Sequence, residues 1–310
     1  MYIFIVNPIA GSRKAKKILH SLSETTVYQK MAQKVYMTTG SGHAKSLVNT
    51  HITMNEHHAV EGVVVIGGDG TLHEVINGLG SNRIPIAYIP TGSGNDFKRG
   101  AQITLSPEET LENLYTRNNP LFYWIGTYLD EKKETYYFMN CVGMGFDAKV
   151  AECVNKSFIK SLLHRIGLGK ILYITALLRE ISFFKPFSVR IQVDAQTYEY
   201  SNCLFAVVNQ HPYFGGGMKI NPTAINNREK VSLLVVDSIP RWKVFALFLT
   251  VFFGAHLHLK EVNVCKGGQI SIQTAEPVLT QSDGETNTKQ YVTIKIANEP
   301  VEIYGARGTD

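Results

Sequence analysis

The feature that most constrains this chain is a glycine-rich turn that directly follows a buried strand. Gly67-Gly68-Asp69-Gly70-Thr71 comes after Val60–Ile66, a run of valine and isoleucine that predicts a strand covered on both faces. Three glycines in four positions let the backbone come close to an oxygen-rich ligand. The helix predicted over Leu72–Leu79 adds the partial positive charge of its N-terminus. The turn therefore favours phosphate binding, although a plain strand-to-helix turn capped by Asp69 also fits these five residues.

A second turn of the same kind, Pro90-Thr91-Gly92-Ser93-Gly94-Asn95-Asp96, follows the strand predicted over Ile84–Ile89. The strand predicted over Tyr2–Val6 runs into a third loop, Asn7–Ser12, with basic residues behind it. The carboxyl ends of neighbouring parallel strands share one edge of a sheet, where α/β folds bind ligands, so we expect three loops to converge. No Gly-x-x-x-x-Gly-Lys-Ser/Thr sequence occurs, which excludes a P-loop. No Gly-x-Gly-x-x-Gly follows the first strand, which argues against a dinucleotide oxidoreductase.

Two kinds of periodicity divide the chain. Strand, glycine turn and helix recur over residues 1–120 and predict a parallel sheet of βαβ units, to which residues 298–310 are expected to return. Over residues 121–297 strand-like runs dominate and predict a mostly antiparallel β domain with flanking helices, and the cleft between the domains is the expected ligand site. The strands expected there are Tyr136–Val142, Phe187–Val193, Tyr198–Asn209, Val231–Val236, Glu261–Cys265, Gln269–Gln273 and Val292–Ala297, and the helices are about Ala148–Phe184 and Arg241–His256.

Composition and charge exclude several classes of protein. With 44% apolar and 18% charged residues among 310, the chain is neither disordered nor collagen-like. The net charge of +5 hides two basic zones, because residues 1–60 and 151–190 each hold seven basic and two acidic residues. Such zones favour anionic partners. Four scattered cysteines argue against a zinc ribbon or a disulfide scaffold. The chain shows no cleavable signal, and its strongest apolar run, Val244–Ala255, is too short for a membrane span.

A third motif, Asp283-Gly284-Glu285, lies in a turn between predicted strands of the second domain. Two carboxylates that flank a glycine can supply a base and an orienting or metal-binding group. An Asp-Gly pair is also a common hairpin turn. The three residues alone leave both interpretations open.

The motifs occur in an order that resembles the diacylglycerol kinase catalytic family. The resemblance is to the soluble bacterial lipid kinases above all, with sphingosine kinases as more distant relatives, and it covers nearly the whole chain. The GGDGT element alone is shared with NAD kinases and phosphofructokinases, so the implied first domain has an NAD-kinase/phosphofructokinase-like α/β fold. The elements that carry the resemblance, besides the three motifs above, are Asn7-Pro8…Gly11, Glu74-Val75…Asn77-Gly78-Leu79, Phe97, Phe138-Met139-Asn140…Gly143…Gly145-Phe146-Asp147 and Asn209…Phe214-Gly215-Gly216-Gly217-Met218.

The resemblance implies ATP-dependent phosphorylation of a lipid hydroxyl, with a diacylglycerol-like acceptor. Asp283 matches the family's proposed general base, which would take the proton of the attacking alcohol. Asp96 and Glu285 would complete an acidic cluster able to hold Mg²⁺ near the γ-phosphate. The nucleotide-binding residues that the resemblance implies are Asn7, Thr38, Gly67, Gly68, Asp69, Gly70, Thr71 and Ser93.

Two positions depart from the family pattern. Where close members carry an acidic segment that helps bind a structural Mg²⁺, this chain has Arg228-Glu229-Lys230-Val231-Ser232, and an arginine cannot be a metal ligand, so we predict no structural metal site. Where many members have an aspartate near the domain junction, this chain has Trp124. The alternatives left open are another acceptor (a sphingoid base, a polyprenol or NAD) and a catalytically weakened regulatory protein that binds lipid or nucleotide.

Two segments have apolar residues suited to lipid. Arg241–His256 predicts either a helix packed on the second sheet or an open apolar wall for acyl chains. Lys156–Arg179 mixes basic and apolar residues and predicts either contact with an anionic membrane surface or an amphipathic helix with a solvated basic face. We therefore expect a cytoplasmic, peripherally membrane-associated protein with a lipid substrate and no nucleic-acid partner. An exposed sheet edge in the second domain would suit a homodimer.

Overall fold

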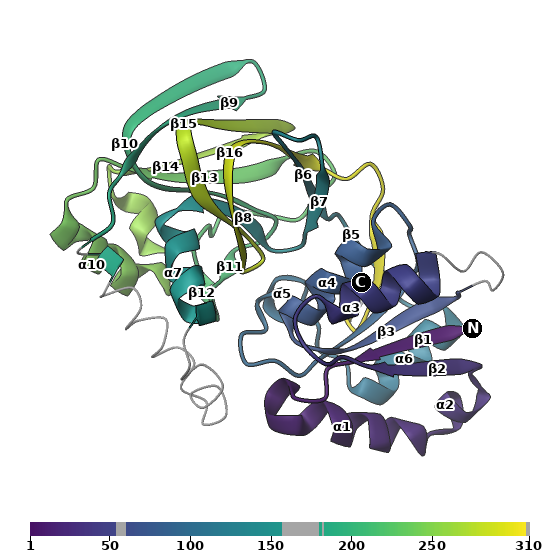
Figure 1. Ribbon diagram of the computed structural model, residues 1–310. Helices are drawn as coiled ribbons and strands as arrows, with labels where there is room; N and C mark the ends of the chain where they lie inside the picture. Colours follow the sequence, from purple (N-terminus) through teal and green to yellow (C-terminus); the bar gives the residue numbers. More distant parts are fainter. Residues whose placement is uncertain (54–59, 157–179, 182, 308–310) are drawn as a thin grey trace. The chain divides into compact units, whose positions relative to one another are not determined.

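The computed structural model describes residues 1–53, 60–156, 180–181 and 183–307, in two compact units (Figure 1). The first unit comprises Met1–Tyr123 and Glu299–Asp310, and the second comprises Trp124–Asn298. The C-terminal segment thus belongs to the first unit, because its strand joins the first sheet.

The first unit is built on a six-stranded sheet in the order β2-β1-β3-β4-β17-β5. β3 lies between β1 and β4 and is parallel to both, so the ends of these three strands share one edge. Every residue of β1 and β3 is buried, as expected for parallel strands covered on both faces. The strands are β1 (Tyr2–Val6), β2 (Gln33–Met37), β3 (Gly62–Gly67), β4 (Ile86–Pro90), β5 (Leu121–Tyr123) and β17 (Val301–Tyr304).

Helices cover this sheet on both faces, with α1 on one and α3 and α4 on the other (Figure 1). The sequence analysis missed α6, which has a clear local start signal. Ser106 accepts a hydrogen bond from the Glu109 backbone N–H, and the Glu109 carboxylate accepts one from the Ser106 N–H, so both groups of a capping box are satisfied. The helices are α1 (Ala10–Ser23), α2 (Thr26–Lys30), α3 (His43–Val48), α4 (Asp69–Leu79), α5 (Asp96–Gly100) and α6 (Pro107–Thr116), with a π-helical turn over Asn49–Thr53.

The second unit is built on a nine-stranded antiparallel sheet in the order β14-β13-β10-β8-β15-β16-β6-β7, with β9 pairing with β10 and β15. The antiparallel second domain predicted from sequence is confirmed. Its strands are β6 (Gly126–Asp130), β7 (Thr135–Phe138), β8 (Cys141–Gly145), β9 (Phe187–Val193), β10 (Gln196–Asn209), β13 (Val231–Asp237), β14 (Val262–Gly267), β15 (Gln269–Ser282) and β16 (Glu285–Ile296), beside a small ribbon of β11 (Tyr213–Phe214) and β12 (Met218–Lys219).

The strand β10 shows how the second unit is layered. Its first half alternates between exposed and partly buried residues, whereas its last seven residues are all buried. Alternate residues in that half, such as Ala206 and Val207, pack into two different hydrophobic clusters. One cluster lies among the strands alone, and the other lies between the sheet and the helices α7 (Phe146–Lys156) and α10 (Arg241–Val251), on the same side of the sheet in Figure 1.

Several boundaries predicted from sequence are wrong. The strands predicted over Gln269–Gln273 and Val292–Ala297 are parts of the much longer β15 and β16. The single strand predicted over Tyr136–Val142 is two strands, β7 and β8, because the chain leaves one neighbour and joins others at Met139-Asn140. The helix predicted over Arg241–His256 ends at Val251, and a 3₁₀ turn over Ala255–His258 follows a left-handed Gly254. Of the predicted helix over Ala148–Phe184, α7 covers the beginning, and residues 157–179 lie outside the described part.

No helix among the described residues is both long and apolar enough to cross a membrane.

Candidate active site

The three loops that follow β1, β3 and β4 are tied together at one edge of the first sheet. The backbone N–H of Asn7 donates to the Ile66 carbonyl at 2.9 Å, and the Asn7 side-chain amide donates to the Thr71 hydroxyl at 3.2 Å. The Thr91 N–H donates to the Gly67 carbonyl at 2.8 Å. The structure therefore places the predicted residues Asn7, Gly67 and Thr71 in one contiguous group.

The glycines of these loops have two different steric roles. A Cβ added to Gly92 would lie 2.9 Å from the Gly68 Cα, and one added to Gly11 would lie 2.0 Å from the Thr91 carbonyl oxygen. These glycines allow the loops to touch. A Cβ added to Gly70 would meet no atom within 4 Å, and the N-terminus of α4 beside it has no side-chain cap. Gly70 therefore leaves open space at a helix N-terminus, which suits an anionic ligand.

The loop after β1 carries backbone strain. Gly11, Ser12 and Arg13 have φ angles of 57°, 57° and 73°, so regular helix begins only after them. Non-glycine residues in this left-handed region are uncommon and cost about 1–3 kcal/mol each. Strain of this kind concentrates at functional sites. The regular part of α1 is thus preceded by a turn that the local sequence does not favour.

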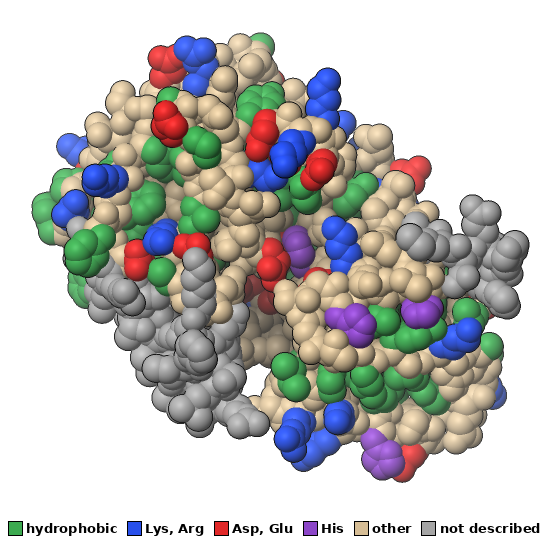
Figure 2. All heavy atoms as spheres, viewed as in Figure 1, with side chains coloured by type: hydrophobic (Ala, Val, Ile, Leu, Met, Phe, Trp, Pro, Cys, Tyr) green, Lys and Arg blue, Asp and Glu red, His purple; other side chains and the backbone are tan. Residues whose placement is uncertain are grey.

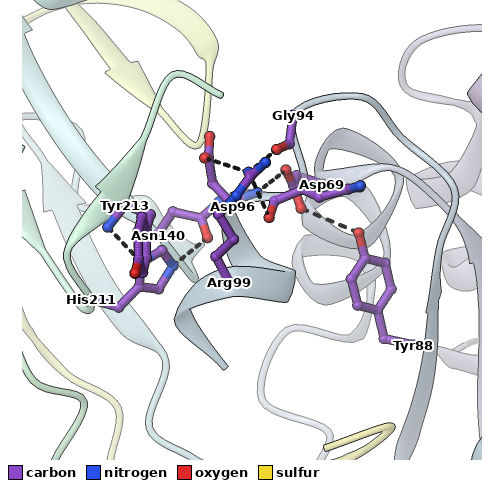
Figure 3. Close-up of polar contacts among 9 residues, drawn as sticks. Asp69, Tyr88, Gly94, Asp96, Arg99, Asn140, His211 and Tyr213 are labelled. Atoms are coloured by element: carbon purple, nitrogen blue, oxygen red, sulfur yellow. Dashed lines mark hydrogen bonds and ion pairs between the residues drawn. The ribbon is translucent and has the colours of Figure 1, made fainter. Parts of the chain in front are cut away.

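Asp69 joins the two glycine turns. Its Oδ1 accepts a hydrogen bond from the Tyr88 hydroxyl at 3.2 Å, and its Oδ2 accepts one from the Asp96 backbone N–H at 2.9 Å (Figure 3). Tyr88 is fully buried, and its burial and the Asp69 charge raise the pKa of its phenol well above the usual value. The Tyr88 phenol is therefore a fixed donor that orients the Asp69 carboxylate.

Arg99 braces the second glycine turn, and the sequence analysis missed it. Its guanidinium donates to the carbonyls of Gly94 and Asn95 and lies 3.5 Å from the Asp96 carboxylate (Figure 3). The signal was present, because an acidic and a basic residue three apart face each other on a helix. Arg99 brings a positive charge to the turn that holds Ser93.

The residues at this edge fit a nucleotide phosphate. Within the described part of the chain, the buried Thr91 hydroxyl and the Asn95 side-chain oxygen have no hydrogen-bond partner. A buried hydroxyl without a partner is costly unless a ligand or water satisfies it. Thr38 lies at the end of the neighbouring strand β2, buried, with its N–H donating to the Val6 carbonyl at 2.8 Å. The edge thus offers a hydroxyl donor, an uncapped helix N-terminus and open space.

Glu74 fixes the loop that follows Thr38. Its two carboxylate oxygens accept hydrogen bonds from the backbone N–H groups of Gly42 and Ala44, at 2.8 and 2.9 Å. The bonds join α3 to α4, which carries Glu74. The role of Glu74 is therefore structural, because its carboxylate holds α3 against α4.

In the second unit, Asp283 occupies the hairpin turn between β15 and β16. Its Oδ1 accepts hydrogen bonds from the backbone N–H groups of Asn140 and Cys141, at 2.8 and 3.0 Å, and its Oδ2 accepts one from Met139 at 2.8 Å. Asp283 and Gly284 both have positive φ, 50° and 94°, as a two-residue hairpin turn requires. Asp283 is thus both a turn residue and a carboxylate held in one orientation.

The same turn is held by two further side chains. Gln281 is fully buried, and its Oε1 accepts a hydrogen bond from the Gly284 N–H at 2.9 Å, while its Nε2 donates to Asp147 Oδ2 at 3.2 Å. Asn155, on α7, donates to the Gly284 carbonyl at 2.8 Å. Burial raises the pKa of Asp147 to about 7, although the hydrogen bond from Gln281 acts to lower it. Gln281 therefore links Asp147, whose carboxyl group has a raised pKa, to the turn that contains Asp283.

A buried histidine holds Asn140, which lies in the segment between β7 and β8 whose backbone N–H groups donate to Asp283. His211 Nδ1 accepts a hydrogen bond from the Tyr213 N–H at 3.1 Å, so its Nε2 carries the hydrogen and donates to Asn140 Oδ1 at 2.7 Å (Figure 3). Burial lowers the pKa of His211 to about 4, partly offset by the charge of Asp283. The imidazole is neutral near pH 7 and acts as a fixed donor. The sequence analysis did not single out His211.

The two positions that depart from the family pattern have other partners. The Asn226 side chain accepts from the Trp124 N–H at 3.0 Å and donates to the Trp124 carbonyl at 2.7 Å. Arg228 is exposed, and the Ser232 hydroxyl accepts from the Asn221 amide at 3.0 Å. Among the residues that the structure describes, no three His, Cys, Asp or Glu side chains gather as a metal site would require.

The predicted catalytic carboxylates divide between the units. Asp96 lies in the first unit beside Asp69, whereas Asp283 and the exposed Glu285 lie in the second, on either side of Gly284. The predicted acidic cluster of Asp96, Asp283 and Glu285 stays a prediction.

Two family models match consecutive parts of the chain. Residues 1–121 match the diacylglycerol kinase catalytic domain. Residues 140–305 match the YegS C-terminal NAD kinase beta sandwich-like domain. One match thus falls in the first unit and the other covers most of the second, and residues 122–139 lie between them.

Individual proteins give the same assignment. YtlR of Bacillus subtilis, whose name classes it as a lipid kinase, is 32% identical over 290 residues, which is 92% of this chain and 93% of that protein. A Mycobacterium tuberculosis protein named diacylglycerol kinase is 24% identical over 270 residues, 87% of this chain and 84% of that protein. A crystal structure of a Bacillus anthracis protein described as a diacylglycerol kinase has a TM-score of 0.67 at 19% identity, covering 98% of this chain and 96% of that one, so the fold is shared.

Proposed function

Because the chain belongs to the diacylglycerol kinase catalytic family, whose members are lipid kinases, we propose that it is an ATP-dependent kinase for a diacylglycerol-like lipid. In this reaction the lipid hydroxyl oxygen forms a bond to the γ-phosphorus of ATP, the bond from that phosphorus to the β–γ bridging oxygen breaks, and ADP leaves. The hydroxyl proton passes to a carboxylate of the protein.

The observation that carries the proposal is the joining of the two glycine turns at one edge of the first sheet. Asp69 accepts the Asp96 N–H, and the Thr91 N–H donates to the Gly67 carbonyl, so both turns are held at the end of adjacent strands. Beside them lie open space at Gly70 and the uncapped N-terminus of α4. Backbone N–H groups and a helix N-terminus are a phosphate-binding arrangement.

In this proposal the first unit holds the phosphates and the second handles the proton. Thr71, Thr91 and Ser93 carry hydroxyls on the loops, and Arg99 supplies positive charge behind the second turn. Asp283 is the proposed base because it matches the family's proposed general base, and three backbone N–H groups hold its carboxylate in one orientation. Glu285, exposed and two residues away, is the neighbouring carboxylate that could share this role.

Mg²⁺ is proposed to accompany the nucleotide. It commonly binds through one or two carboxylates together with substrate phosphates and water. The described residues offer single carboxylates, such as Asp96, and no ready-made cluster of three. When bound with ATP, Mg²⁺ would neutralise charge on the phosphates. We do not propose a separate structural metal site, because Arg228 and Ser232 stand where carboxylates would be needed.

The test is a phosphorylation assay on a total lipid extract, with the product identified by mass spectrometry. Purified protein, ATP and Mg²⁺ should yield a phosphorylated lipid, and a diacylglycerol should give phosphatidic acid. Omission of ATP or Mg²⁺ should abolish the product. A sphingoid base, a polyprenol and NAD are assayed in parallel, and phosphorylation of NAD with none of any lipid would overturn the proposal.

A catalytically weakened regulatory protein is the second candidate, and Trp124 is the observation that favours it. The resemblance implies an acidic residue at this position in many members, and Asn226 holds the Trp124 backbone through two hydrogen bonds. Nucleotide binding by calorimetry without turnover on any acceptor would support this candidate. A Trp124→Asp variant that gains lipid phosphorylation would identify the missing group.

A further inference from the structure

The outer face of α10 exposes a stripe of large apolar side chains. Trp242, Phe245 and Leu249 are 72%, 49% and 60% exposed, and Phe253, in the turn that follows the helix, is 84% exposed. Their spacing of three, four and four residues places successive members on one helix face. These four residues are called the α10 stripe below. Isolated exposed apolar residues are normal, but a contiguous row of aromatic ones marks an interaction site.

The opposite face of α10 already has its partner. Val244, Leu247 and Val251 are buried in the hydrophobic cluster that lies between the second sheet and its helices. Packing within the unit therefore explains these inner residues and leaves the α10 stripe unexplained. A surface helix normally carries polar residues on its outer face.

The charge next to the α10 stripe is mainly positive, although Asp237 and Glu261 flank it in sequence. Residues 238–260 contain Arg241, Lys243 and Lys260 and no aspartate or glutamate. Arg241 and Lys260 are exposed, and the Lys243 ammonium lies 5.7 Å from the centre of the Trp242 ring while it pairs with Glu261. Figure 2 shows hydrophobic side chains beside Lys and Arg at the edge of the molecule where α10 lies in Figure 1.

We infer that the α10 stripe inserts into the interface of an anionic phospholipid membrane. Tryptophan and phenylalanine lie favourably at the boundary between headgroups and acyl chains, and a helix that lies in this plane buries its apolar face there. Each neighbouring Lys or Arg adds roughly 1 kcal/mol of attraction to an anionic leaflet. A phospholipid surface satisfies both the exposed apolar row and the mainly positive charge around it.

The inference rests on the proposed function, since a kinase for a membrane lipid must reach its acceptor at the membrane surface. It assigns that contact to α10, which is described, rather than to the basic segment Lys156–Arg179 expected from sequence, most of which lies outside the described residues.

The first experiment measures vesicle binding by flotation, without any activity readout. The full chain is mixed with vesicles of phosphatidylcholine containing phosphatidylglycerol, and compared with a Phe245→Ser/Leu249→Ser variant. The variant should bind about tenfold more weakly, because exposed apolar area drives insertion. The matched control is Phe122→Ser, which replaces a 56% exposed phenylalanine of the first unit and should bind like the wild type. Equal binding by the stripe variant and the wild type overturns the inference.

The second experiment uses Trp242 as its own reporter. The chain has two tryptophans, so Trp124→Phe leaves Trp242 as the single emitter, and Trp242→Phe is the matched blank. Anionic vesicles should shift the Trp242 emission to the blue, and brominated lipids should quench it. Protein that floats with vesicles while the Trp242 emission stays unchanged binds through another surface, which overturns the inference.

Two further readouts separate this inference from its alternatives. If sedimentation shows that the stripe variant loses a dimer while vesicle binding is unchanged, the α10 stripe is a protein interface and the inference fails. If vesicle binding depends on the stripe but no lipid is phosphorylated, the proposed function fails and the membrane surface stands. With a short-chain diacylglycerol dissolved as monomers, the stripe variant should phosphorylate at the wild-type rate, while its rate on vesicles falls about tenfold with its binding.

Discussion

The edge of the first sheet where the loops after β1, β3 and β4 meet is called the glycine edge here. It binds through backbone groups, whereas the Asp283 turn of the second unit depends on a charged side chain. At the glycine edge, short loops that each follow a parallel strand bring backbone groups together. Within each loop the residues that matter are consecutive in sequence. At the Asp283 turn, a carboxylate accepts hydrogen bonds from Met139, Asn140 and Cys141, which lie more than 140 residues away along the chain.

The two sites should therefore lose function in different ways. The backbone donors at the glycine edge cannot be removed by substitution. A side chain added at a glycine can, however, block a ligand from reaching them. The Asp283 site depends on one charged side chain and on the groups that hold it. Substitutions can therefore separate ligand exclusion at the first site from loss of chemistry at the second.

The largest expected effect is that of Asp283→Asn. The variant should lower kcat by at least about 100-fold, since an amide cannot accept the hydroxyl proton. The nucleotide dissociation constant should change less than about twofold, because the substitution leaves the loops of the first unit intact. Steady-state kinetics and calorimetry measure the two quantities.

Glu285→Gln is the matched control for this carboxylate. It should lower kcat by less than about tenfold, as expected for a supporting group. A reversal of the two effects would make Glu285 the base and Asp283 a structural turn residue. Activity of Asp283→Asn above a tenth of wild type would exclude it as the base.

The second effect concerns stability and the buried Asp147. Burial raises its pKa from 3.8 to about 7, so between these pH values the unfolded chain releases a proton that the folded chain keeps. The ionisation thus favours unfolding, and the wild type should lose stability relative to Asp147→Asn as the pH rises from 4 to 7. The gap should approach a few kcal/mol, at about 1.4 kcal/mol per pKa unit. Urea unfolding at pH 4 and pH 8 measures it, and an equal gap at both would contradict the raised pKa.

The third effect tests the open space at the glycine edge. Gly70→Ala adds a Cβ that meets no protein atom within 4 Å. The variant should be as stable as the wild type or up to about 1 kcal/mol more stable, because alanine favours a helix over glycine. Its nucleotide affinity should fall about tenfold, as for a lost contact of about 1.4 kcal/mol. Unchanged affinity would show that phosphate does not approach Gly70.

The smallest effect is that of Tyr88→Phe. It removes the hydroxyl that donates to Asp69 Oδ1 at 3.2 Å while keeping the ring in the core. Stability should fall by about 1 kcal/mol, the net contribution of one hydrogen bond. Nucleotide affinity should weaken only slightly if Asp69 keeps its bond to the Asp96 N–H. A loss of affinity as large as that of Gly70→Ala would show that Tyr88 orients the nucleotide loops.

Much of the first unit could be predicted from sequence, because its signals are local. The buried run before Gly67 became β3, and the turn after it opened α4. The strained turn at Ser12 and Arg13 could not be predicted, because non-glycine residues rarely adopt positive φ and the neighbouring contact of Gly11 with Thr91 joins segments far apart in sequence. Tyr88 was missed because its partner Asp69 is fixed only once the loops meet, whereas Arg99 has partners three to five residues away and could have been found from the local sequence.

In the second unit the prediction was weaker for a physical reason. The break between β7 and β8 has no glycine or proline signal, and it arises because the two strands pair with different neighbours. Gln281, Asp147 and His211 acquire their roles through contacts from distant segments. Even the exposed row on α10 could not be separated from its buried face, since both are apolar in sequence.

The family, the two kinds of sheet and the glycine turns could be predicted from residue order and from periodicity over short segments. The groups that hold each carboxylate, the strained backbone and the outward side of α10 are evident only in the folded chain. Those properties depend on contacts between segments far apart in the chain, and burial, which sets both the altered pKa of Asp147 and the exposure of Trp242, exists only once those segments have packed.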